Sequence, residues 1–82
     1  MKKFELISVA RDDLEICVEF FATKREAVDA MVKSIIEFTS YASLDEILRD
    51  AEEDLCGYSE DEAWADSRVG TISWKIVELP SA

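Results

Sequence analysis

The spacing of the apolar residues changes twice along this chain, and those changes limit the folds that it can adopt. Apolar and polar side chains alternate in residues 3–10 and again in residues 14–21, as they do in β-strands. The residues that follow place apolar side chains three and four apart, which is the period of an amphipathic helix. Alternation returns over residues 69–79 and stops before Pro80. This order of periods predicts an α+β domain.

The first two predicted strands are separated only by the three polar residues 11–13. A connection this short joins neighbouring antiparallel strands, so we expect a hairpin. Phe4 and Leu6 share one face of the first strand. Ile7 and Val9 share the other, and we take the face of Phe4 as the inner one.

Helix starts are marked by a Ser or Thr followed three residues later by Glu, because the two residues can cap each other's backbone N–H groups. The signature occurs at Thr23 with Glu26, at Ser43 with Glu46, and at Ser59 with Glu62. The first predicts a helix to about Thr39. The second predicts a helix that Gly57 ends in a left-handed cap, and the third predicts a short helix to about Asp66.

These elements, in the order ββα(αα)β, predict a three-stranded sheet with two helices plus a short third helix over one face. A chain of 82 residues buries one modest core, so we expect a single domain over residues 1–82. The predicted core is Phe4, Leu6, Ile16, Val18, Val28, Met31, Val32, Ile35, Leu48, Leu55, Ile72, Trp74 and Ile76.

The sequence contains no histidine, which removes the commonest general base and the commonest zinc ligand. Its two cysteines, Cys17 and Cys56, lack the spacing of a zinc site or a disulfide framework. Apolar runs are too short to span a membrane. We therefore expect a non-enzymatic protein of the cytoplasm, without cofactor, metal or membrane contact.

The negative charge of the chain is concentrated in one segment. Residues 45–66 contain ten acids and one base, Arg49, for a net charge of −9, whereas the whole chain has −10. Acids in the first turn of a helix gain about 0.3–1 kcal/mol each from the helix dipole. Glu52, Glu53 and Asp54 instead fall in the last turn of the predicted second helix, where the dipole disfavours them. A basic partner would explain their position.

We predict that this segment binds a basic surface of another protein. A row of carboxylates could replace DNA phosphates in a nucleic-acid-binding groove, whereas the chain itself has no basic patch with which to bind nucleic acid. The simpler alternative is that the acids have no binding role and only keep the protein soluble. The predicted site residues are Asp45, Glu46, Asp50, Glu52, Glu53, Asp54, Glu60, Asp61, Glu62, Trp64 and Asp66.

In size, acidity and lack of catalytic residues the chain resembles small phage and mobile-element proteins, such as anti-CRISPR and anti-restriction proteins, that block nucleic-acid-binding enzymes. The resemblance is one of class rather than of sequence, and it implies an inhibitor that mimics DNA. The alternative hypothesis is an assembly protein that forms a homodimer or pairs with another sheet through a strand edge. A contiguous acidic face with Trp64 exposed favours the first, and a long edge strand favours the second.

Overall fold

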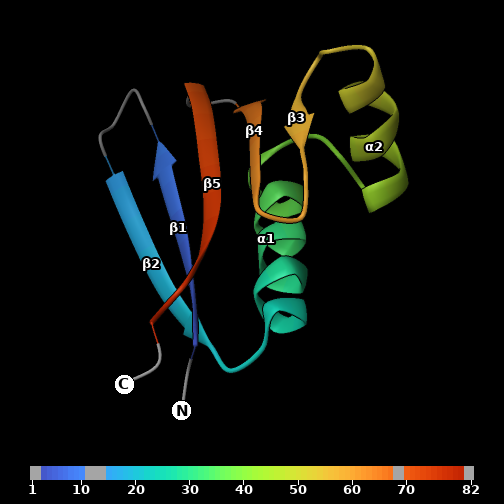
Figure 1. Ribbon diagram of the computed structural model, residues 1–82. Helices are drawn as coiled ribbons and strands as arrows, with labels where there is room; N and C mark the ends of the chain where they lie inside the picture. Colours follow the sequence, from blue (N-terminus) through green and yellow to red (C-terminus); the bar gives the residue numbers. More distant parts are fainter. Residues whose placement is uncertain (1–2, 11–14, 68–69, 81–82) are drawn as a thin grey trace.

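Five strands and two helices form the part of the chain that the computed structural model describes, which is residues 3–10, 15–67 and 70–80. In chain order they are β1 (Phe4–Ala10), β2 (Glu15–Phe21), α1 (Lys24–Phe38), α2 (Leu44–Glu52), β3 (Gly57–Tyr58), β4 (Glu62–Ser67) and β5 (Gly70–Glu78). The strands form one antiparallel sheet in the order β2-β1-β5-β4-β3 (Figure 1). The α+β class is confirmed, whereas the predicted three-stranded sheet with a third helix is wrong.

The sheet is built around β5, the last strand of the described chain. β5 pairs with β1 on one side and with β4 on the other. Its alternation buries Ile72, Trp74 and Ile76 on the inner face of the sheet. β1 pairs in turn with β2, as the short connection predicted, although that connection lies outside the described residues. β2 and the two-residue β3 are therefore the edges of the sheet.

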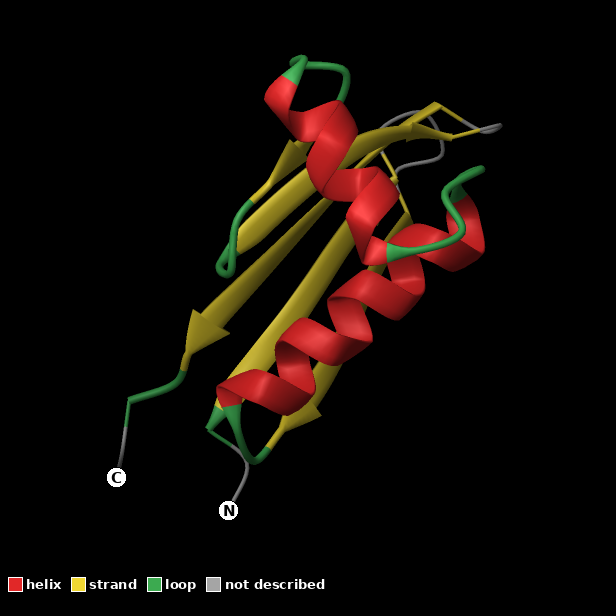
Figure 2. Cartoon of the chain, turned by 90° about the vertical axis from the view of Figure 1, so that its right-hand side faces the viewer, coloured by secondary structure: helices red, strands yellow, loops and turns green. Residues whose placement is uncertain are grey.

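Helix α1 covers the inner face of the sheet, and it begins and ends where the sequence predicted. The Thr23 hydroxyl accepts a hydrogen bond from the Glu26 backbone N–H at 3.2 Å, which caps the first turn. The buried side chains of α1 are Ala27, Met31 and Ile35. Both helices lie on the same side of the sheet, so no helix of the described residues lies over the outer face (Figure 2).

Trp74 connects α1 to the sheet at the centre of the core. Its side chain is 1% exposed, and its Nε1–H donates to the Ser34 hydroxyl at 2.8 Å. A buried donor left without a partner costs about 1–3 kcal/mol. Ser34 therefore allows the largest side chain of the core to be buried at little polar cost.

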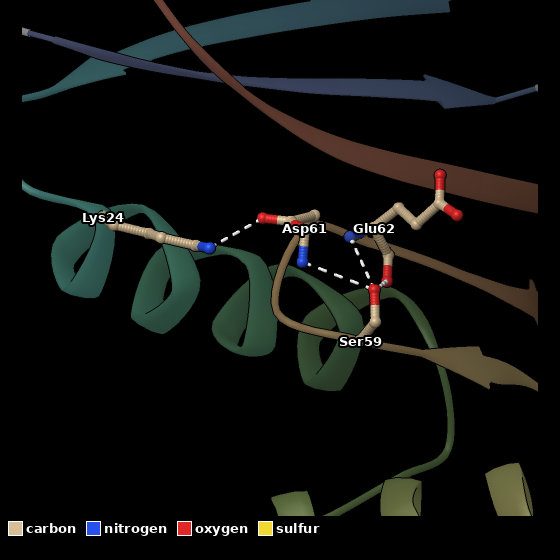
Figure 3. A network of polar contacts seen from close by, with 4 residues as sticks. All are labelled: Lys24, Ser59, Asp61 and Glu62. Atoms are coloured by element: carbon tan, nitrogen blue, oxygen red, sulfur yellow. Dashed lines mark hydrogen bonds and ion pairs between the residues drawn. The ribbon is translucent and has the colours of Figure 1, made fainter.

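The predicted third helix is instead a turn followed by strand β4. The Ser59 hydroxyl does accept a hydrogen bond from the Glu62 backbone N–H, at 3.1 Å, as a helix cap would. It also accepts one from the Asp61 backbone N–H (Figure 3). The Ser59 backbone N–H donates to the Glu62 carbonyl at 2.8 Å. Such short-range bonds form in turns as well as at helix starts. Beyond the turn, burial alternates along residues 62–66, which is the period of a strand.

The predicted core is right on α1, β1 and β5 and wrong on β2. Leu6, Met31, Ile35, Ile72, Trp74 and Ile76 are buried, and Phe4, Val28 and Val32 pack partly buried against them. Ile16 and Val18 are exposed, because β2 pairs with β1 in a register that places Glu19 opposite Leu6. The apolar residues of β2 therefore lie on the outer face of the sheet.

Helix α2 packs beside β3 and buries Ile47. Two other predicted core residues of this region, Leu48 and Leu55, are exposed. Leu48 lies on α2, whose only buried residue is Ile47, and Leu55 follows the end of the helix. No helix in the described part of the chain is long and apolar enough to cross a membrane.

Candidate partner-binding surfaces

The predicted site residues do not form one helical surface. They fall into three groups, because the second half of the acidic segment is a turn and a strand. Helix α2 and its C-terminal cap carry Asp45, Glu46, Asp50, Glu52, Glu53 and Asp54; the β3–β4 turn carries Glu60 and Asp61; and β4 carries Glu62, Trp64 and Asp66.

The acids at the start of α2 stabilise the helix. The Ser43 hydroxyl accepts a hydrogen bond from the Glu46 backbone N–H at 3.4 Å, and the Glu46 carboxylate accepts one from the Ala42 N–H at 2.7 Å. These bonds satisfy backbone donors that a helix start leaves without partners. Asp45 lies in the same turn and is favoured by the helix dipole. Local energetics account for these acids without a partner.

The acids at the end of α2 have no such role. Glu52, Glu53 and Asp54 are all exposed. Within the described residues, none of them has a Lys or Arg nitrogen within 4.0 Å. The helix dipole also disfavours negative charge here. Because the three carboxylates are exposed and have no cation partner among the described residues, they are available to a cation of another molecule.

The C-terminus of α2 is closed by Asp54 rather than by the predicted Gly57. Asp54 is in the left-handed region, at φ 60°. Its N–H donates to the Ala51 carbonyl at 3.2 Å, and the Leu55 N–H donates to the Asp50 carbonyl at 3.0 Å. This is the bond pattern of a Schellman cap, in which glycine is the usual left-handed residue. Gly57 lies beyond the cap, in β3.

The β3–β4 turn contains the only ion pair among the described residues, and it is internal. Asp61 contacts the Lys24 ammonium at 2.8 Å, which links the turn to the first residue of α1 (Figure 3). The hydrogen bond to Asp61 raises the pKa of Lys24. The Asp61 carbonyl also accepts a hydrogen bond from the Ile76 N–H at 2.7 Å. Asp61 is therefore a structural residue of the turn, and Glu60 beside it is exposed.

Trp64 lies on the outer face of the sheet and is 42% exposed. It pairs with Gly57 of β3 on one side and with Ser73 of β5 on the other. A Cβ placed on Gly57 would overlap the Nε1 and Cδ1 atoms of the indole, so the ring lies against the Gly57 backbone. This packing, rather than a helix cap, explains the glycine. Glu62 and Asp66 flank Trp64 on the same face of β4.

The outer face also bears five apolar side chains from β1 and β2, which we call the apolar patch: Ile7, Val9, Ile16, Val18 and Phe20. Ile7 pairs with Val18, and Val9 pairs with Ile16, so their side chains stand side by side. Ile16, Val18 and Phe20 are 66%, 43% and 46% exposed. Sequence reasoning assigned Ile16 and Val18 to the core and did not predict this patch. The feature of the sequence that could have indicated the patch is the first strand, which carries apolar side chains on both faces.

The thiol of Cys56 and the hydroxyls of Tyr41 and Tyr58 belong to side chains that pack in or against the core near α2. Cys56 is 3% exposed, and its thiol donates to the Ile47 carbonyl at 3.5 Å. Burial raises the pKa of the Tyr41 hydroxyl, and the nearby Cys56 and Asp50 raise it further. Burial also raises the pKa of Tyr58. The described residues contain no group of three His, Cys, Asp or Glu side chains that could hold a metal ion.

The structure thus places Trp64, Glu62 and Asp66 on the same face of the sheet as the apolar patch, whereas α2 lies on the opposite side of the sheet. No protein-family model, curated protein or solved structure matches this chain.

Proposed function

We propose that this chain is a non-enzymatic protein-binding module that meets its partner with the outer face of its sheet. The observation that carries the proposal is the exposure of Trp64 and the apolar patch on that face, while α1 covers the inner one. Contiguous apolar surface left exposed marks interaction sites, and tryptophan is enriched among the residues that dominate binding energy. The lack of histidine in the sequence supports a binding role.

The charges around this face indicate the chemistry of the partner. Glu62 and Asp66 flank Trp64, and Glu5 lies beside Phe20. Lys75 is the cation between them, opposite Glu62 in the β4–β5 ladder. Acidic side chains around an apolar centre complement a partner whose apolar residues are surrounded by Lys and Arg. We therefore infer a partner protein whose binding surface has an apolar centre surrounded by Lys and Arg side chains.

Affinity capture with matched variants tests the proposal. The wild-type chain is compared with Trp64→Ala and Val18→Thr on the outer face, and with Glu37→Gln on the exposed side of α1 as the control. We expect proteins that bind the wild type and the control to be lost from both outer-face variants. Proteins that bind all four chains equally would show that the outer face is not the docking surface.

We propose as a second candidate that α2 presents its carboxylates to a nucleic-acid-binding groove, as an inhibitor of the anti-restriction or anti-CRISPR kind would. It is favoured by Glu52, Glu53 and Asp54, which have no Lys or Arg partner among the described residues and lie at a helix end where the dipole disfavours their charge. Such binding weakens as salt shortens the Debye length from about 10 Å at 0.1 M to about 3 Å at 1 M. Reversing Asp50 and Glu53 to Lys should then slow association with a captured partner. Association that is insensitive to both changes would exclude this surface.

A further inference from the structure

We propose that a second copy of this chain pairs with strand β2, antiparallel and centred on Val18, so that two sheets join into one. β2 is an edge of the sheet, and its residues from Glu15 to Phe20 are all exposed. An edge strand presents unpaired backbone N–H and C=O groups, which are a template for pairing. Within the described residues no strand pairs with this edge, and α1 contacts β2 without burying any residue from Glu15 to Phe20.

The sequence of β2 is self-complementary in this register. A two-fold axis through Val18 places Val18 opposite its own copy and Ile16 opposite Phe20 of the second copy. Pairs of β-branched and aromatic residues are favourable across antiparallel strands. On the other face, Glu15 meets Phe21 and Glu19 meets Cys17, so no carboxylate lies directly opposite another.

Other two-fold registers of the same strand are worse. An axis through Cys17 sets Glu15 opposite Glu19 twice, and an axis through Glu19 sets that residue opposite its own copy. Directly opposed like charges destabilise a strand pair. An axis through Ile16 or Phe20 pairs only three residues of β2, whereas the axis through Val18 pairs all seven. The register centred on Val18 is thus the only one that uses the whole strand without opposing carboxylates.

The expected dimer has a small interface, and electrostatic repulsion between the two copies opposes its formation. Seven residues span about 23 Å of edge, and a contact of this size lies below the roughly 1,200 Å² of a standard interface. Each copy also carries a formal charge of −10. We therefore expect exchange between monomer and dimer, and an association that strengthens as salt screens the repulsion. Binding of a basic partner has the opposite salt dependence, so the dimer can fail without the proposed partner binding failing, and the reverse.

Cysteine cross-linking tests the register. Val18→Cys and Ile7→Cys are made separately, each with Cys17→Ser, and treated with a mild oxidant. Directly opposed residues of antiparallel strands lie about 4.5–5.5 Å apart at Cα, within disulfide range. The two copies of residue 7 would be three strand spacings apart, about 14 Å, and out of range. We expect a covalent dimer from Val18→Cys and none from Ile7→Cys.

The other outcomes overturn the proposal. Cross-linking of both variants would indicate that the outer faces stack, and cross-linking of the unaltered chain through Cys17 would indicate another register. A monomeric mass by light scattering at all protein and salt concentrations would exclude a dimer. As a second measurement, Val18→Lys opposes two like charges and should weaken association about tenfold or more. Amide hydrogen exchange in residues 15–21 should slow with protein concentration in the wild type and not in Val18→Lys.

Discussion

At Gly57 the backbone of β3 and the indole of Trp64 occupy adjoining space, so that no Cβ fits between them. We predict that Gly57→Ala displaces the ring and lowers the free energy of unfolding by about 1–3 kcal/mol, as overpacking does. Urea denaturation measures the loss. Acrylamide quenching of tryptophan fluorescence measures the displacement, because Trp74 is buried and Trp64 supplies the accessible signal.

The matched control for this substitution is the same change in a chain that carries Trp64→Ala. Without the indole there is nothing for the new methyl group to displace, so Gly57→Ala should then cost much less. The difference between the two costs is the coupling energy of the pair. Equal costs in both backgrounds would mean that the backbone conformation of Gly57, and not the ring, requires glycine.

Asp54 holds a left-handed conformation that costs an L-residue about 1 kcal/mol. We predict that Asp54→Gly raises the free energy of unfolding by about 0.5–1 kcal/mol, since glycine adopts this conformation without that penalty. Asp54→Ala removes the same charge but keeps the Cβ, so it should be less stable than Asp54→Gly. Two variants of equal stability in urea would attribute the effect to charge alone.

At the scale of the elements, negative charge has opposite effects on stability at the two ends of helix α2. We predict that changing Glu52, Glu53 and Asp54 to Gln, Gln and Asn leaves the protein as stable or slightly more so, because the helix dipole disfavours these charges. Glu46→Gln is the contrasting change, since its carboxylate accepts the Ala42 N–H, and it should cost about 0.5–1 kcal/mol. A loss beyond about 1 kcal/mol in the triple variant would show that those carboxylates make structural bonds.

The elements that sequence reasoning placed correctly are those whose signals are local. Thr23 and Ser43 cap α1 and α2 as predicted, and the strands β1, β2 and β5 follow their alternation. The Ser59 signature failed, because the same hydrogen bonds close a turn. β4 went unpredicted because its inward residues, Ala63 and Ala65, are small and weakly apolar. A strand of that kind is defined by its pairing with β5, which local sequence does not report.

In the whole molecule, the sheet has one face that builds the core and one that does not. We predict that Ile16→Thr and Val18→Thr each change the free energy of unfolding by less than about 0.5 kcal/mol, measured at concentrations where the chain is monomeric. Ile72→Thr, the same change on the inner face of β5, should cost more than about 2 kcal/mol. A cost above 2 kcal/mol at Ile16 or Val18 would place these side chains in a packed core.

The sequence singled out some residues of the candidate surfaces and missed others. Charge counting selected the acids, and residue type selected Trp64. It could not separate acids with a structural role, such as Glu46 and Asp61, from those without one, because that depends on which N–H or ammonium group lies nearby. The apolar patch was missed because the inner and outer faces of β2 are decided by its register with β1.

The position of β5 at the centre of the sheet bears on how the protein is made. β5 lies between β1 and β4 and joins them in one sheet, and it is the last of the described strands to leave the ribosome. The pairing of β1 with β5 spans most of the chain, and contacts so distant in sequence form slowly. Until β5 has been made, β1 lacks a partner along one edge, and Leu6 lacks the Ile76 side chain that lies opposite it. Unpaired strand edges and exposed apolar surface make incomplete folds prone to aggregate, so a ribosome stalled before Gly70 would prolong the state in which this chain is most vulnerable.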